Sequence, residues 1–232
     1  MVVVFLCLTS IASNYIILNF TFICMKDDPS GLRDRGNTTV NIFDYSQSER
    51  SALIWAVGVG TTLGTFPINH LMIKSGARWV CFGCALISAI ASLLSPFLAS
   101  LGLWPFLFAR FLQGIAYAAD FAAIGAVVVR WVPCTEYAIF LSVLTAFTPI
   151  SSFATNSLTG FLCESSLGWR SSFYIHAAFG FIMAVVWLLL FSDGPEKSRF
   201  TNQKEIELIH RNKSSTEIEE HKEVPYKVKV KN

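Results

Sequence analysis

Two charged side chains lie deep inside one long apolar segment of the sequence. The segment runs from Trp104 to Pro133, and away from its ends the only charged residues are Arg110 and Asp120. At 1.5 Å per residue, a helix of this length crosses the roughly 30 Å hydrocarbon core of a bilayer. A charge inside a membrane is costly and by default indicates a functional site, so we expect the remaining helices to shelter these two residues.

Arg110 carries a permanent charge on a planar fork of donors, which suits a carboxylate or a phosphate group. Gly114 and Tyr117 follow it at spacings of four and three residues, on the same helical face. Our hypothesis is that this face lines a central cavity, with Gln113 as a further residue on the path. Arg110 then either holds an anionic substrate or braces its helix against backbone carbonyls of neighbouring helices.

Asp120 has no obvious ion-pair partner, because Arg110 lies about 15 Å away along the helix. Two roles remain open for this carboxyl group. It either accepts a proton, since burial disfavours the charged form, or serves in helix packing, neutral or bonded to hydroxyls of the segment 138–162. In that polar segment, Asn156 either lines the same path or bonds to backbone across helices.

The composition is that of a membrane protein. Of the 232 residues, 53% are hydrophobic and 15% are charged, whereas soluble domains carry about 25% charged residues. A net charge of +2 is too small to suggest a nucleic-acid partner. The six cysteines lack the spacing of a disulfide framework or a metal site. The sequence has no phosphate-binding loop and no paired nucleophile and base, so we do not expect an enzyme.

Six apolar segments are each long enough for a transmembrane helix, which predicts an all-α membrane protein. The first segment also resembles a signal peptide, but its apolar character continues past a cleavage-like site at Ser13, which favours a helix. A polar loop, 26–50, follows it, and a polar cytosolic segment, 193–232, follows the last span. The predicted spans are 2–25, 51–73, 79–101, 104–129, 138–162 and 171–192.

The distribution of lysine and arginine predicts that both termini face the cytosol. Six spans place the hairpin 74–78, the loop 130–137 and the tail on one side, where most basic residues lie. The sequon at Asn37 then faces the outside or a lumen, where it predicts a glycosylation site. Cys24 and Cys163 share that outer face. A disulfide between them is conceivable, but free thiols are the favoured expectation.

Several short motifs follow one another in an order that resembles a known family. They are R-x-x-Q-G at Arg110 to Gly114, W-x-P-x-x-E at Trp131, Pro133 and Glu136, G-W-x-x-x-F-Y from Gly168, D-x-P from Asp193 and V-P-Y-K from Val224. Each motif is short, but their order and spacing together are specific. The chain resembles the major facilitator superfamily and, within it, the anion:cation symporters of the sodium-phosphate cotransporter, sialin and vesicular glutamate transporter group.

The resemblance implies a fold, a function and partners. Such transporters consist of two six-helix halves around a midplane site, and the chain is similar to the N-terminal half alone, ending where helix seven would begin. The implied function is secondary transport of organic or inorganic anions, of the phosphate or carboxylate class, driven by sodium ions or protons without another cofactor. A homodimer or a second transporter half is the implied partner. The implied location is the plasma membrane or a lysosomal or vesicular membrane.

The hairpin between the second and third spans departs from the family pattern. Lys74, Gly76 and Arg78 fit it, but Ile73 stands where an acidic residue is expected. This departure weakens the case for the charge lock that the family builds there. Trp131 and Trp169 are expected to anchor the helices at the membrane interface.

The fourth span departs from the pattern as well. Many family members carry a glutamate where this chain has Tyr117, and Asp120 lies one turn further on. Such losses favour an alternative function, in which a non-transporting six-helix protein is an inactive fragment or an interaction partner of a full-length transporter. The retained Arg110, Gln113 and Gly114 favour transport.

Overall fold

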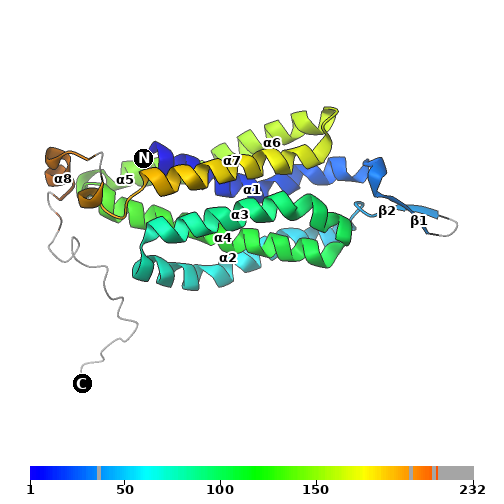
Figure 1. The fold of residues 1–232 in the computed structure, drawn as a ribbon, viewed down its shortest axis with the longest axis horizontal. Coiled ribbons are helices and arrows are strands. Elements are labelled where there is room, and N and C mark those ends of the chain that lie inside the picture. The colour runs from blue at the N-terminus through cyan, green and yellow to red at the C-terminus, as the bar shows by residue number, and fades with distance from the viewer. Residues whose placement is uncertain (36–37, 199–200, 211–212, 214–232) are drawn as a thin grey trace, which may run out of the picture.

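The structure, a computed structural model, describes residues 1–35, 38–198, 201–210 and 213. In this part of the chain, six spans long and apolar enough to cross a membrane lie side by side in one elongated bundle (Figure 1). The fold is therefore the predicted all-α membrane protein with six spans. The spans are α1 (Val2–Lys26), α2 (Gln47–Ser75), α3 (Ala77–Leu101), α4 (Leu103–Trp131), the pair α5 (Tyr137–Thr145) and α6 (Phe147–Glu164), and α7 (Gly168–Leu190).

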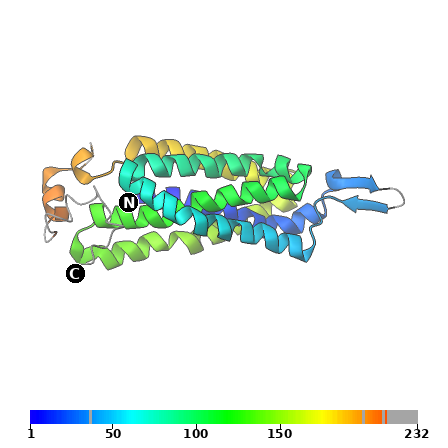
Figure 2. The same ribbon diagram turned by 90° about the horizontal axis from the view of Figure 1, so that it is seen from below.

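Short elements lie at the two ends of the bundle. At one end, strands β1 (Leu32–Arg35) and β2 (Thr38–Asn41) form an antiparallel hairpin in the loop after α1. At the other end lies helix α8 (Gln203–His210), as two perpendicular views show (Figures 1 and 2). Asn37 lies outside the described residues, so its glycosylation stays a prediction.

Helix α1 lies in the interior of the bundle. It packs against α3, α4, α6 and α7, and Ile17, Leu18 and Met25 have no exposed surface. A helix that is apolar around its whole circumference can be buried on every side. The segment that also resembled a signal peptide is thus the central helix of this fold.

Helices α2 and α6 lie at opposite edges of the bundle (Figure 1). The main neighbour of α2 is α4, and that of α6 is α1. Both helices leave large apolar side chains uncovered, and Phe66 on α2 and Phe153 on α6 are each 77% exposed. Lipid tails solvate such side chains as well as a protein interior does, so these faces suit contact with lipid or with a further set of helices.

The fifth span is not the single helix expected over 138–162. It divides at Ala146, between α5 and α6. The cause is Pro149, which has no N–H to donate to the Thr145 carbonyl and whose ring crowds it. Helical hydrogen bonds resume on both sides, from Ala146 N to Ser142 O and from Ile150 N to the Ala146 carbonyl. The result is a bent span whose second part, α6, packs along α1.

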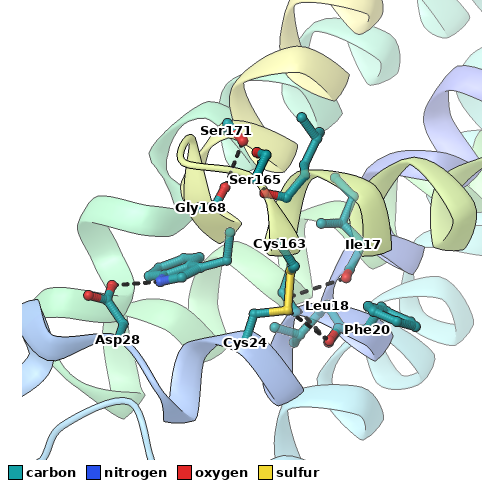
Figure 3. The surroundings of a disulfide bond; sticks show 12 residues. Ile17, Leu18, Phe20, Cys24, Asp28, Cys163, Ser165, Gly168 and Ser171 are labelled. Atoms are coloured by element: carbon teal, nitrogen blue, oxygen red, sulfur yellow. Dashed lines mark hydrogen bonds between the residues drawn. A yellow bond between two sulfur atoms is a disulfide. The ribbon is translucent and has the colours of Figure 1, made fainter.

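A disulfide joins α1 to α6 at the end of the bundle that carries the hairpin. Cys24 and Cys163 are bonded, with their Cα atoms 5.9 Å apart (Figure 3). The favoured expectation of free thiols was therefore wrong. The two residues are separated by 139 positions, and their proximity depends on α6 lying beside α1, which the spacing of the cysteines does not predict.

Asp28 organises the polar groups beside this disulfide (Figure 3). Its carboxylate accepts hydrogen bonds from the Trp169 indole at 2.7 Å and from the Ser30 backbone N–H at 2.8 Å, and it lies 3.4 Å from the Arg170 guanidinium. Burial raises the pKa of Asp28, but the hydrogen bonds and the Arg170 charge outweigh burial and hold that pKa below its usual value. Trp169 is 3% exposed, so it is a buried residue of this cluster and the expectation of an interface anchor was wrong for it.

We expect loss of the disulfide to destabilise the protein. Cys24→Ser should lower the free energy of unfolding by about 2–5 kcal/mol, the usual range for a native disulfide, while Cys134→Ser, the matched control, should have a smaller effect. Alkylation of the denatured protein followed by mass spectrometry checks the bond directly. Four cysteines should react before reduction and six after it, and six labels without reduction would contradict the structure.

The lowered pKa of Asp28 predicts a dependence of stability on pH. A carboxyl group whose pKa is lower in the folded state stabilises that state above its unfolded pKa of about 4, and this contribution is lost as the pH falls through the folded value. Asp28→Asn should therefore reduce the free energy of unfolding at neutral pH by about 1 kcal/mol, the usual value of one hydrogen bond. The midpoint of thermal unfolding should fall accordingly. In thermal melts, the difference between the two proteins should shrink below about pH 4. A difference that is independent of pH would contradict the assignment.

Candidate functional site

Arg110 is buried and its guanidinium bonds to three acceptors. Nη2 donates to the Tyr15 carbonyl at 2.8 Å, Nη1 donates to Gln113 Oε1 at 2.6 Å, and Nε lies 3.5 Å from the Leu53 carbonyl. The side chain is 1% exposed. Arg110 thus ties α4 to α1 and α2, which is the bracing role left open by the sequence.

Gln113 extends this network into α3. Its Nε2 donates to Ser92 Oγ at 2.8 Å and to the Asn14 carbonyl at 3.2 Å, and Asn14 Nδ2 donates to Ser88 Oγ at 3.0 Å. Sequence reasoning missed Asn14, Ser88 and Ser92. The two serines stand four residues apart in an apolar span, on one helical face, and that spacing was the available signal.

A pocket of about 440 Å³, here the Arg110 pocket, opens beside this arginine. The Tyr15 and Tyr117 rings, which both line it, pack against each other at an interplanar angle of 52° with their centroids 4.5 Å apart. The structure therefore brings Arg110 and Tyr117 together on one wall, whereas Gln113, Asp120 and Asn156 do not line it. The lining residues are Tyr15, Asn19, Ile54, Val57, Gly58, Thr61, Thr62, Arg110 and Tyr117.

The charge of Arg110 is not neutralised by a carboxylate. Within the described part of the chain, no acidic side chain lies within 4.0 Å of its guanidinium. The three acceptors are neutral and occupy one N–H on each nitrogen, and a guanidinium carries five. The wall of the pocket thus carries a net positive charge and has donors left for an anion.

Asp120 lies apart from this pocket. It is 1% exposed, and neither carboxylate oxygen has a hydrogen-bond partner. The hydroxyls of Thr155 and Thr159 on α6 also have no partner, so the alternative that α6 hydroxyls bond Asp120 is not realised. On the same helix, the Asn156 side-chain oxygen is buried without a partner.

Glycines set the distance between α2 and α4. A Cβ atom at Gly114 would overlap the Val57 carbonyl, and one at Gly60 would overlap the Phe111 carbonyl. The close approach lets Thr61 Oγ1 donate to the Gly114 carbonyl at 3.0 Å. Small residues allow such backbone contact between membrane helices. Gly114 therefore determines where α2 forms its side of the pocket.

The hairpin between α2 and α3 is held by Asp193, three residues after the end of α7. Asp193 Oδ1 accepts the Arg78 backbone N–H at 2.9 Å, and the Asp193 carbonyl accepts Arg130 Nη1 at 2.6 Å. The Arg78 guanidinium in turn donates to the Leu188 carbonyl at the end of α7. Gly76 has a φ of +84° and lies against the Asp193 carboxylate. Asp193 thus provides a carboxylate at this end although Ile73 is apolar.

The remaining motif residues are peripheral to the pocket. Lys74 and Glu136 are exposed, and Pro133 begins the short 3-10 turn Cys134–Glu136 after α4. The Trp131 ring packs near Phe191, with centroids 6.3 Å apart. These residues shape the C-terminal end of α4 rather than the pocket.

Comparisons with known proteins agree with this geometry. A family model described as Major Facilitator Superfamily matches residues 3–226. Sodium-dependent phosphate transport protein 1 of Homo sapiens is 28% identical over 199 residues, which cover 82% of this chain and 42% of that protein. Sialin of Homo sapiens is 24% identical over 173 residues, which cover 75% of this chain and 35% of sialin. The chain therefore spans less than half the length of these curated relatives.

A solved structure gives the same picture of the fold. The inward-open xylose transporter XylE from E. coli matches 90% of this chain and 51% of its own, with a TM-score of 0.66 and 16% identity. At this identity the likeness shows the fold alone. The relatives and the fold are those of transporters, not of enzymes.

The close contact at Gly114 gives a prediction about stability. Gly114→Ala should push α2 away from α4 and lower the free energy of unfolding by about 1–3 kcal/mol, the usual cost of overpacking. Gly125→Ala on the same helix is the matched control, because open space surrounds that position. Thermal melts of the three proteins in detergent check this expectation. Equal midpoints for Gly114→Ala and the unsubstituted protein would contradict it.

Proposed function

Because the chain belongs to the Major Facilitator Superfamily, we propose that it forms one half of a membrane transporter for organic or inorganic anions. The phosphate or carboxylate class of anion fits the site best. A guanidinium with two free N–H groups can bind either one through parallel hydrogen bonds. Sodium-dependent phosphate transport protein 1 is named for phosphate, which is the same class of substrate.

One observation carries this proposal: the buried charge of Arg110 on the wall of the Arg110 pocket has no carboxylate partner among the residues that the structure describes. An isolated charge of this kind is unfavourable in a membrane. An anion that enters the pocket provides the missing countercharge and gains from the low dielectric constant around it. The bracing bonds to α1 and α2 hold the guanidinium in place, so bracing and binding are compatible roles for one side chain.

The proposal includes a second half, a coupling ion and an orientation. A homodimer or a second transporter half would complete the pocket, with sodium ions or protons as the driving ion. Both termini would face the cytosol, in the plasma membrane or in a lysosomal or vesicular membrane. The Cys24–Cys163 disulfide supports this orientation, because disulfides persist on the extracellular or lumenal side and the basic hairpin lies at the opposite end.

Uptake into proteoliposomes tests the proposal. The chain would be reconstituted and supplied with labelled phosphate and a panel of labelled carboxylates, under a sodium gradient or a pH gradient. We expect uptake of at least one anion, and Arg110→Ala should reduce it more than tenfold, which corresponds to about 1.4 kcal/mol or more of lost binding. Asn19→Ala, which alters an exposed residue of the pocket, should raise the KM.

Two controls make the result interpretable. Glu164→Gln, at the outer end of α6 and away from the pocket, should leave uptake unchanged. An intact Cys24–Cys163 disulfide and a helical circular-dichroism spectrum report that each variant is folded. Folded protein that takes up no anion in any gradient would contradict the proposal and favour the alternative, a non-transporting partner of a full-length transporter.

A further inference from the structure

A second pocket lies between α2 and α4, close to the hairpin that joins α2 to α3. Its volume is about 280 Å³, which is room for several water molecules. Asn69 of α2 and Arg130 of α4 are its polar lining residues, and the rest of its wall is apolar. A mostly apolar pocket with a few polar groups is typical of a site that orients a small ligand. We call it the Arg130 pocket.

Arg130 brings a positive charge to this pocket. Its Nη1 donates to the Asp193 main-chain carbonyl at 2.6 Å, which is a neutral acceptor. Within the described residues no acidic side chain lies within 4.0 Å of the guanidinium, because the Asp193 carboxylate accepts the Arg78 N–H instead. The Lys213 ammonium donates to the carbonyl of the lining residue Val129 at 2.8 Å and adds a second cation nearby. The charge of the pocket therefore suits an anion.

The Arg130 pocket and the Arg110 pocket lie along one groove between α2 and α4, which pack side by side (Figure 1). On α2, Gly58 and Thr62 line the Arg110 pocket. Asn69 and Ile73 line the Arg130 pocket. Their spacings of four, seven and four residues place them on one face of the helix. From Thr62 to Asn69, the step from one pocket to the next is about 10 Å along α2.

Two aromatic residues of α4 stand between the pockets. Tyr117 lines the Arg110 pocket, and Phe121, one turn further on, lines the Arg130 pocket. Their rings contact edge to face, with centroids 5.3 Å apart. Phe121 is 56% exposed, so no packed neighbours hold its ring on the open side. A turn of this side chain to another rotamer would join the two pockets without displacing a helix.

We propose that the Arg130 pocket is a second binding site for the transported anion, of the phosphate or carboxylate class. This inference rests on the proposed function, because it concerns the path of the same anion. In the proposed orientation the site lies between the Arg110 pocket and the cytosol. A guanidinium there gives an anion that leaves Arg110 a second countercharge, and ions pass through pores most readily when binding is divided among several sites.

Chemical protection of Arg130 tests the site without any transport. The folded chain, in an uncharged maltoside detergent, is treated with phenylglyoxal, which modifies accessible arginine side chains, and each modified peptide is quantified by mass spectrometry. Inorganic phosphate should slow the modification of Arg130 severalfold relative to chloride of equal ionic strength. Arg33, an exposed residue of the β-hairpin at the opposite end, should react equally fast in both salts. Equal rates at Arg130 in both salts would overturn the inference.

Filling the pocket provides a matched pair of variants that keep every charge. Gly125 lines the Arg130 pocket, and a Cβ atom there meets open space. Gly83 on α3 also faces open space but does not line this pocket. The ratio of the Arg130 modification rates in chloride and phosphate should fall to one in Gly125→Leu and stay high in Gly83→Leu. Protection that survives in Gly125→Leu would place the anion outside the pocket and overturn the inference.

A phosphate group at Arg130 could instead belong to a lipid, since basic pockets between membrane helices bind lipid headgroups. The same experiment, in chloride with phosphatidylglycerol added to the detergent, distinguishes the two sources. Protection by inorganic phosphate without added lipid supports the inference. Protection by phosphatidylglycerol with none by inorganic phosphate would assign the pocket to a lipid headgroup and overturn it.

Uptake into proteoliposomes separates this inference from the proposed function. If the chain transports anions, Arg130→Gln should reduce uptake about tenfold, as expected for the loss of one charge-assisted hydrogen bond. Lys74→Gln, which removes an exposed cation at the same end that does not line the pocket, should leave uptake unchanged. Uptake that depends on Arg110 but not on Arg130 would overturn the inference and leave the proposed function intact. If phosphate protects Arg130 in folded protein that takes up no anion, the binding site stands and the proposed function fails.

Discussion

The bundle depends on one buried guanidinium that is held by neutral acceptors. Arg110 reaches the Tyr15 carbonyl of α1 and the Leu53 carbonyl of α2, and each carbonyl can accept it because an oxygen has two lone pairs, of which the helix uses one. The Arg110 guanidinium comes close enough to the Leu53 carbonyl because Gly114 lets α2 lie against α4. Neutral acceptors bond three of the five N–H groups of Arg110 and leave its charge uncompensated, so one residue fixes three helices and leaves a positive potential beside the pocket.

Arg110 and Asp120, both in the membrane-spanning part of α4, are arranged in opposite ways. Arg110 is hydrogen-bonded through each of its three nitrogens and lies at a pocket, whereas in the described part of the chain Asp120 has no hydrogen bond and is enclosed. An arginine stays charged in proteins, while a carboxyl group can become neutral by taking up a proton. A permanent charge therefore needs bonds to persist in a membrane, and a group that can be neutral does not.

Much of the fold follows from local patterns in the sequence. The six spans are evident because each apolar run is long enough to cross a bilayer, and the R-x-x-Q-G motif at Arg110 marks the α4 network. The disulfide and the docking of Asp193 on the hairpin were not predictable, since both join segments far apart in the sequence. The break at Ala146 has a local cause in Pro149, but whether a proline bends or ends a membrane helix depends on its neighbours. Asn14, Ser88 and Ser92 were missed because polar residues in a span show no partner until the helices are placed.

The position of α1 has a consequence for how the protein is made. Helix α1 precedes the other described helices in the sequence, yet two of its main neighbours, α6 and α7, are synthesised only after α2 to α5. While the intervening helices are synthesised, the surface of α1 that α6 and α7 later cover has no partner in the bundle. Cys24 can find Cys163 only after α6 has inserted, so oxidation of this pair marks the moment at which the first helix is enclosed. The disulfide therefore distinguishes a bundle in which α1 and α6 have packed together from one in which that contact is still missing.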